Sequence, residues 1–336
     1  MKTGPKNLIT DVSGILVGNS EDKEKKTGTT VLVGEAGLIA GYHVMGGAPG
    51  TRETDLLAPD KLVEKIDAIV LSGGSAFGLD AASGVSQELL KAGRGFPTKR
   101  MRVPIIPSAI LYDLDNGGDK NWPTNFYRNL GIQAIQNASL NFKIGSSGAG
   151  AGATTGNLKG GLGSASLILE EEFVVGAIVA VSSMGSTIVP GGKHFWAAPF
   201  ELDSEFGGLG IAKKFDELSV HNGRALPFAV ESTTIGVIAT DAKLTKAQAT
   251  RISTAAHDGL ARSIFPSHTP FDGDLIFCVS TGKKPLVDPA LDTMNIGNAA
   301  AHCVARAVAR AVYSASYETN DKLPCWSDIS GTTRAM

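Results

Sequence analysis

Two hydroxyl residues in front of a β-branched run are the clearest candidates for chemistry in this sequence. The run begins at Thr233 and continues through Ile235 and Val237 to a turn at Asp241, which is typical of a strand buried on both faces. A cut between Ser232 and Thr233 would give the threonine a free α-amine beside its hydroxyl. An α-amine has an ordinary pKa of about 7.7–8.0, so near pH 7 part of it is neutral and can accept the hydroxyl proton. The alternative interpretation is that the hydroxyl groups only cap or turn the strand start.

Two aspartates further along the chain could bind or orient an amine. Asp272 and Asp274 flank Gly273 directly before an expected strand over 275–280. Side chains two residues apart on a strand point the same way, and glycine between them lets another group come close. The alternative is a turn with solvated aspartates. With His268 they could also form a metal site, but one histidine and two carboxylates are weak support for one, so we predict no metal.

Lys159 is the only lysine in the glycine-dense segment 145–163. A phosphate-binding loop needs lysine directly after its last glycine, whereas Gly156 is separated from Lys159 by two residues, and the dinucleotide pattern is met only loosely. The segment therefore indicates a backbone that passes close to another element, with one lysine available as a charge.

Ser75 stands where the nucleophile of a serine hydrolase could lie. It follows a strand over 69–72 and precedes a helix that we expect to end at Gly93. The nucleophile elbow requires Gly-x-Ser-x-Gly, and Phe77 occupies the last glycine position. Ser75 is therefore interpreted as a turn or cap residue, and a conventional serine hydrolase is the less favoured hypothesis.

The remaining patterns alternate between strands and helices. We expect strands over 8–17, 29–40, 103–111 (interrupted by Pro104 and Pro107) and 173–181, a helix that starts with a capping box of Thr245 and Gln248, and an alanine-rich helix over 299–315. The charged stretch 215–230 is expected to be an accessible linker before the cut. This alternation predicts α/β layers around one core.

The composition argues against a disordered chain, a nucleic-acid partner and a membrane span. The 336 residues are 43% apolar and carry 31 basic and 33 acidic side chains, so neither a disordered chain nor a nucleic-acid partner is expected. No apolar run reaches the length of a signal peptide or of a membrane span. Three distant cysteines indicate reduced thiols and a cytoplasmic setting.

Four long motifs resemble the P1 peptidase family, which includes L-aminopeptidase/D-esterases, β-aminopeptidases and a hydrolase of nylon oligomers. They are Gly-Gly-Ala-Pro-Gly-Thr-Arg-Glu-Thr-Asp-Leu-Leu (46–57), Gly-Gly-Ser-Ala-Phe-Gly-Leu-Asp-Ala-Ala (73–82), Thr-Thr-Ile (233–235) and His-Thr-Pro-Phe-Asp-Gly-Asp (268–274). The resemblance implies a four-layer α-β-β-α sandwich without a cofactor. It also implies self-cleavage into chains 1–232 and 233–336, an N-terminal nucleophile at Thr233, and homo-oligomers that are commonly tetramers of the processed heterodimer.

The resemblance also implies roles for single residues. Lys159 falls where the nylon-oligomer enzyme has a lysine beside the nucleophile, and Tyr112 where it has a tyrosine in the substrate pocket. Asp272 and Asp274 match its paired aspartates. An ammonium near the Thr233 hydroxyl favours its deprotonation, while the aspartates can hold the α-ammonium form or bind a substrate amine.

Two departures from the family pattern bear on activity. Relatives commonly have asparagine at the position of Ser232, and they place an asparagine, as an oxyanion donor, near Ser182 and Ser183. Losing one such donor can cost about 10²–10³ in rate, so weak activity or a shifted substrate range is expected. The sequence therefore predicts a self-processing amide hydrolase, most simply an aminopeptidase acting on short peptides. The alternatives are an endo-hydrolase of oligoamides and an uncut, non-catalytic binding protein.

Overall fold

The computed structural model describes residues 1–214 and 232–331, so the expected linker over 215–230 lies outside the described residues. The strands are β1 (Lys2–Thr3), β2 (Ile15–Asp22), β3 (Thr27–Val44), β4 (Thr51–Arg52), β5 (Ile66–Ser72), β6 (Phe96–Pro97), β7 (Arg102–Val103), β8 (Ser108–Ile110), β9 (Gly161–Ile168), β10 (Val174–Ser182), β11 (Thr233–Ala242) and β12 (Leu275–Lys284). The α-helices are α1 (Ala81–Lys91), α2 (Tyr127–Gln136), α3 (Lys246–Ala261), α4 (Pro289–Tyr313) and α5 (Trp326–Ser330).

One long strand, β3, joins two sheets. The strand order is β1-β9-β10-β11-β12-β3-β5-β8-β4, with β2 also paired to β3. Residues 39–44 of β3 pair with β12, whereas its earlier part pairs with β2 and β5. β3 therefore belongs to a sheet of β9–β12 with one half and to a sheet of β2, β5 and β8 with the other.

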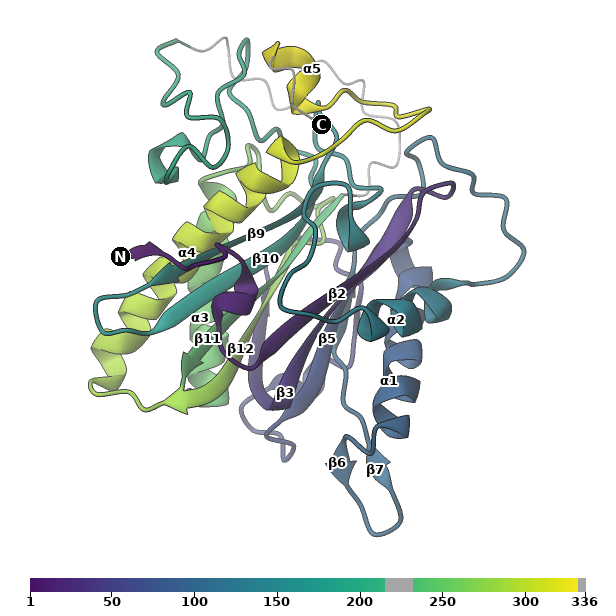
Figure 1. Cartoon of the computed structure of the whole chain (residues 1–336), viewed down its shortest axis with the longest axis vertical. Coiled ribbons are helices and arrows are strands. Elements are labelled where there is room, and N and C mark those ends of the chain that lie inside the picture. Colours follow the sequence, from purple (N-terminus) through teal and green to yellow (C-terminus); the bar gives the residue numbers. More distant parts are fainter. Residues whose placement is uncertain (215–231, 332–336) are drawn as a thin grey trace.

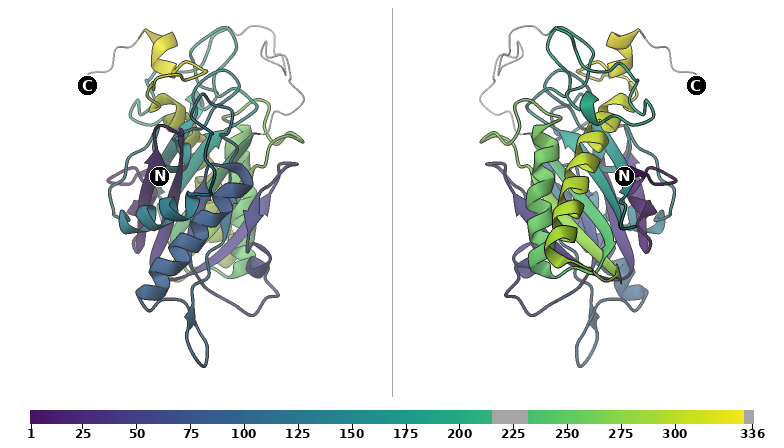
Figure 2. Two further views of the ribbon diagram at one scale, coloured as in Figure 1. Left: turned by 90° about the vertical axis from the view of Figure 1, so that its right-hand side faces the viewer. Right: turned by 90° about the vertical axis from the view of Figure 1, so that its left-hand side faces the viewer.

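Three hydrophobic cores separate four layers. The first lies between the β9–β12 sheet and helices α3 and α4, the second between the two sheets, and the third beneath α1 and α2. Successive side chains of β11 point to opposite faces of the sheet and so enter two different cores. Ile238 belongs to the first core and Val237 to the second. Figures 1 and 2 show the two helix pairs on opposite sides of the sheets. The predicted α-β-β-α sandwich is confirmed.

Strand β11 is buried at every position from Thr233 to Ala242. It runs antiparallel to β10 and parallel to β12, so both of its edges are paired and both of its faces are covered. The predicted strand buried on both faces is confirmed, and so is the central strand predicted over 173–181, which is β10.

The strand predicted over 8–17 is wrong in its first half. Residues 9–11 form a 3-10 turn, and β2 begins only at Ile15. The Asp11 carboxylate accepts hydrogen bonds from the backbone N–H groups of Lys6 and Leu8, which holds the turn. Gly14, at φ +92, then redirects the chain into β2.

Helix α4 begins earlier than predicted, at Pro289 rather than at Ala299. Asp288 caps it, because its carboxylate accepts from the N–H groups of Ala290 and Leu291, and proline fits the first helical turn. The capping box predicted at the start of α3 is confirmed, with Thr245 and Gln248 exchanging hydrogen bonds at 2.9 and 3.2 Å.

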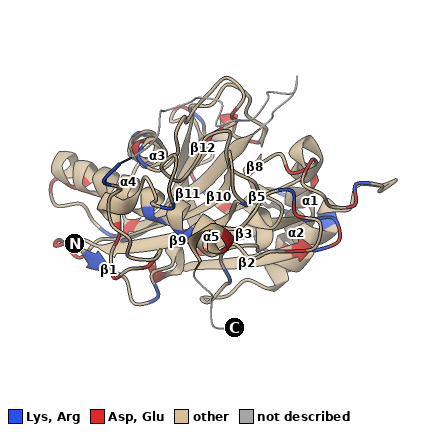
Figure 3. Cartoon of the chain, turned by 90° about the horizontal axis from the view of Figure 1, so that it is seen from above, with Lys and Arg blue, Asp and Glu red and all other residues tan. Residues whose placement is uncertain are grey.

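Charges of both signs are scattered over the elements when the chain is seen from above (Figure 3). Within 1–214 and 232–331, no helix is long and apolar enough to cross a membrane. The three cysteines, Cys278, Cys303 and Cys325, are buried free thiols, as expected.

Glycine at position 163 lets β9 lie directly against α4. A Cβ atom there would lie 1.8 Å from the carbonyl oxygen of Ala307, which confirms that the glycine-dense segment passes close to another backbone. We expect Gly163→Ala to destabilise the protein by about 1–3 kcal/mol, because α4 must move off the sheet. The measurement is the midpoint of denaturant unfolding. Gly297→Ala, with 3.3 Å to the nearest atom, is the control, and equal midpoints for the two variants would contradict the prediction.

Candidate active site

Thr233 lies where the ends of three central strands meet. Because β10 is antiparallel to β11, its last residue, Ser182, stands opposite Thr233. Because β12 is parallel to β11, the loop before it lies beside the residue before Thr233, and Ser232 forms a bridge with Asp272. The side chain of Thr233 is buried, with 4% exposed. The sheet topology thus brings three of the predicted site segments together.

Gly273 contacts both residues of the expected cleavage site. Its N–H donates to the carbonyl oxygen of Ser232 at 2.8 Å. A Cβ atom on Gly273 would lie 2.6 Å from the Thr233 Oγ1 atom and 2.5 Å from the Ala48 carbonyl oxygen. The prediction that this glycine allows a close approach is confirmed, and the groups that approach are the Ala48 carbonyl and the hydroxyl of Thr233.

Asp272 is buried and accepts hydrogen bonds from two directions. Its Oδ2 accepts from the N–H and the hydroxyl of Thr269, at 3.0 and 2.6 Å, and its Oδ1 accepts from the N–H of Met184 at 3.2 Å. Burial, and then the nearby Asp274, raise the pKa of Asp272. The alternative of solvated aspartates is wrong, because Asp272 and Asp274 are only 1% and 2% exposed.

Asp274 contacts Thr234, the residue after Thr233. Its Oδ1 accepts from the N–H of Thr234 at 2.9 Å, and its Oδ2 accepts from the N–H of His268 at 3.1 Å. The Nδ1 atom of His268 also lies 2.8 Å from this Oδ2. A carboxylate therefore stands one residue from Thr233.

Two of the sequence motifs meet at this loop. The N–H groups of Gly46 and Ala48 donate to the carbonyl oxygens of Asp274 and Asp272 at 3.2 and 2.9 Å. A Cβ atom on Gly46 would lie 2.3 Å from the Asp272 carbonyl oxygen. Gly46 and Ala48 therefore hold the loop that carries both aspartates.

Ser182 connects Thr233 to Tyr112. Residues opposite each other in an antiparallel pair have Cβ atoms about 4.5–5.5 Å apart on the same face, so Ser182 is a neighbour of Thr233 by register. The Ser182 hydroxyl lies 3.3 Å from the carbonyl oxygens of Tyr112 and Thr154. Thr154 in turn forms a bridge with Lys159.

Lys159 makes its ion pairs with the C-terminal segment. Its Nζ atom lies 2.8 Å from Asp321 Oδ2 and 3.7 Å from Glu318 Oε2, and Lys26 binds the other oxygen of Asp321 at 2.5 Å. Lys159 and Lys26 are buried, and the side chain of Asp321 is 6% exposed. Sequence reasoning did not single out Asp321 or Lys26. No local sequence pattern indicates an ion pair between residues that are more than a hundred positions apart.

Ser183 is turned to its own backbone. Its hydroxyl donates to the carbonyl oxygen of Gly185 at 2.8 Å and is buried. Because a hydroxyl has a single proton to donate, the proton of Ser183 is already used, whereas the Ser182 hydroxyl makes two longer contacts of 3.3 Å to carbonyl oxygens.

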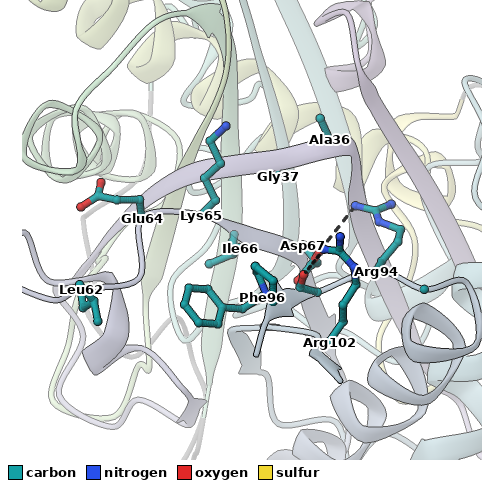
Figure 4. Close-up of a pocket in the computed structure, with 13 residues that line it drawn as sticks. Ala36, Gly37, Leu62, Glu64, Lys65, Ile66, Asp67, Arg94, Phe96 and Arg102 are labelled. Carbon is teal, nitrogen blue, oxygen red and sulfur yellow. Dashed lines mark hydrogen bonds and ion pairs between the residues drawn. The ribbon is translucent and has the colours of Figure 1, made fainter. Parts of the chain in front are cut away.

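The described residues hold no group of three or more histidine, cysteine or acidic side chains that could bind a metal ion. A cavity of about 510 Å³ lies elsewhere, beside β5 and the β6–β7 hairpin. It is lined by Leu62, Phe96 and an Arg94–Asp67 pair at 4.0 Å (Figure 4). None of the predicted site residues lines it, so its size is no argument for placing the chemistry there.

Comparison with known proteins assigns the chain to a family. The sequence model of peptidase family S58 matches residues 7–322. The chain belongs to peptidase family S58. The resemblance inferred from the four motifs is confirmed, and membership of this peptidase family makes the chain a hydrolase of peptide or related amide bonds.

Three proteins similar to this chain range from 39% to 20% in sequence identity. An uncharacterized aminopeptidase of Mycobacterium bovis is 39% identical over 327 residues, which cover 90% of this chain and 92% of the relative. A 6-aminohexanoate-oligomer endohydrolase of a Kocuria species is 26% identical over 297 residues, which cover 84% and 78%. The structure of the L-aminopeptidase D-Ala-esterase/amidase from Ochrobactrum anthropi superposes with a TM-score of 0.71 at 20% identity and covers 96% of this chain and 91% of that chain. It is described as an Ntn-hydrolase variant, and the likeness shows that fold.

Asp113, next to Tyr112, gives the site a pH-dependent neighbour. Its Oδ1 accepts from the N–H of Gly74 at 2.8 Å, and burial raises its pKa to about 6, although Lys120 opposes the shift. In the unfolded chain the pKa is about 3.9. The native state therefore binds the proton of Asp113 more tightly than the unfolded chain does. The contribution of Asp113 to the free energy of unfolding is largest at pH values below the pKa of the unfolded chain.

We expect the stability of the wild type, relative to Asp113→Asn, to fall by at most about 3 kcal/mol as the pH rises from about 4 to about 6. Above that range the difference should stay constant, because the carboxyl is ionised in both states. Denaturant midpoints of both proteins across pH 4–8 measure this, and a difference independent of pH would rule it out.

Proposed function

We propose that the chain is a self-processing amide hydrolase whose N-terminal nucleophile is Thr233. The observation that carries the proposal is the position of Gly273. Its N–H already binds the Ser232 carbonyl oxygen, and its Cα faces the Thr233 hydroxyl. A nucleophile and a polarised carbonyl thus lie on neighbouring residues, against one loop.

The first reaction cuts the chain. The Thr233 Oγ atom attacks the carbonyl carbon of Ser232, and the charge that develops on the carbonyl oxygen is stabilised by the Gly273 N–H. The amide nitrogen of Thr233 leaves as an amine that takes up the hydroxyl proton, and an ester joins Ser232 to Thr233 Oγ. Water hydrolyses this ester. The products are a chain 1–232 ending in a carboxylate and a chain 233–336 starting with a free α-amine.

The same groups then serve the substrate. The α-amine of Thr233 takes the hydroxyl proton, and the carbonyl of an amide substrate occupies the place that Ser232 has left. An acyl-enzyme forms as the amine product departs, and water releases the acid. Asp272 and Asp274 hold the α-ammonium form or a substrate amine. We propose that Lys159 acts through its charge, Ser182 acts as a second oxyanion donor, and Tyr112 and Ser183 take part in substrate binding.

The substrates that we propose are short peptides or amides with a free N-terminus. The aminopeptidase relative supports this choice, as do two buried carboxylates that would bind an ammonium group. A second candidate is endo-hydrolysis of oligoamides, which the Kocuria relative favours. Homo-oligomers, such as a tetramer of processed heterodimers, are part of the proposal and rest on the family resemblance.

Intact mass under denaturing conditions tests the cut directly. The wild type is expected to give two chains, of residues 1–232 and 233–336, whereas Thr233→Ala, which lacks the nucleophile, is expected to stay as one chain. Hydroxylamine should trap an ester on Thr233 during turnover. A wild type that remains uncut would favour the non-catalytic binding protein instead, and activity that survives in Thr233→Ala but not in Ser75→Ala would favour a conventional serine hydrolase.

A methyl group at position 273 should slow self-cleavage. In Gly273→Ala the new Cβ atom would lie 2.6 Å from Thr233 Oγ1, so either the nucleophile or the donor N–H must move. We expect the rate of self-cleavage to fall by about 10²–10³ or more, measured as the loss of uncut chain with time. Gly192→Ala, whose Cβ has no neighbour nearer than 3.8 Å, is the control and should cleave like the wild type.

A further inference from the structure

Three histidine rings lie in a row between helix α3 and the loop that carries the aspartates. His257 on α3 contacts His43 of β3 at 5.2 Å between ring centroids, and His268 at 5.0 Å, both edge to face. His257 is 1% exposed. None of the reaction steps above uses these rings, and sequence reasoning missed His43 and His257.

His257 is a fixed, uncharged ring in this row. Its Nε2 atom lies 3.0 Å from the carbonyl oxygen of His43, so this nitrogen carries the proton and donates it. Burial lowers the pKa of His257 to about 4, which keeps the ring neutral at neutral pH. His257 therefore packs as a fixed, neutral ring against His268.

His268 contacts Asp274 with both its backbone and its ring. The backbone N–H donates to Oδ2 at 3.1 Å, and Nδ1 lies 2.8 Å from the same oxygen. Neither ring nitrogen has an aligned hydrogen-bond partner, so the ring contacts Oδ2 without a hydrogen bond, and this close contact at 2.8 Å restricts rotation of the carboxylate. On the other side, Oδ1 accepts from the N–H of Thr234.

We propose that His268 is a positioning residue for Asp274, and that His257 holds His268 in place. The proposal rests on the proposed function, because the purpose of the arrangement is to keep the carboxylate beside Thr233. With Oδ2 confined by His268, Oδ1 stays on the Thr234 N–H, one residue from the nitrogen that becomes the α-amine. A carboxylate free to rotate would leave this amine without a fixed partner during proton transfer.

The backbone of His268 offers a clean pair of variants. Its φ of +56 lies in the left-handed region, which glycine and asparagine adopt readily. His268→Gly removes the ring and keeps the backbone conformation. His268→Asn keeps the conformation and places an amide near Oδ2. His302→Asn is the matched control, because His302 lies on α4 and packs against Phe200, away from the site.

The kinetic test uses an amino acid p-nitroanilide and the rate of self-cleavage. For His268→Gly we expect kcat and the self-cleavage rate to fall about 10²-fold, the loss typical of a misplaced catalytic group, with KM nearly unchanged. His268→Asn should recover most of the loss, and His302→Asn should match the wild type. A loss equal in the glycine and asparagine variants, or a change confined to KM, would overturn the proposal.

A crystal structure of His268→Gly provides a readout that does not depend on activity. We expect the Asp274 carboxylate to have turned and Oδ1 to have left the N–H of Thr234. An unmoved carboxylate would overturn the proposal even if the variant were slow. The proposed function would fail if Thr233→Ala proved fully active. Even then, the position of the Asp274 carboxylate in the His268→Gly crystal structure would decide whether His268 positions Asp274.

Discussion

The pairing of β11 between an antiparallel and a parallel neighbour is the constraint on which the site depends. It forces the amino end of β11 to meet the carboxyl end of β10 and the amino end of β12, where Ser182 and Asp274 lie. The strand is buried along its whole length, so its backbone hydrogen bonds cannot be exchanged for water. A slip of one residue would turn Thr233 to the other face, so the register fixes the side of the sheet on which the proposed nucleophile lies.

Electrostatics adds a second constraint at the same point. Two carboxylates, Asp272 and Asp274, are buried close together. Asp272 accepts from the N–H groups of Thr269 and Met184, and Asp274 accepts from that of Thr234. Burial and mutual repulsion raise the pKa of Asp272. An ammonium group placed beside these carboxylates would offset both costs, so the two aspartates form a site that favours a positive charge. Self-cleavage would create such a charge at Thr233.

Close backbone packing explains much of the glycine content. Gly46 and Gly273 let two loops and a hydroxyl approach each other around Thr233, and Gly163 lets β9 lie against α4. Farther out, the C-terminal segment reaches back to the body of the chain, where Asp321 binds Lys26 and Lys159 together. Lys159, the lysine predicted to lie beside Thr233, thus forms an ion pair with Asp321, which lies near the C-terminal end of the described residues.

The sequence by itself determined the local features. Periodicity predicted β10 and β11, the Thr245–Gln248 box predicted the start of α3, and the motifs predicted the family and its four layers. These signals act over a few residues or are carried by long matched segments. Only the tertiary structure decided that Asp321 binds Lys159 and that His257 packs against His268. Each depends on contacts made once the sheets have paired, and no local pattern encodes them, because distant pairs are brought together by register and packing rather than by spacing.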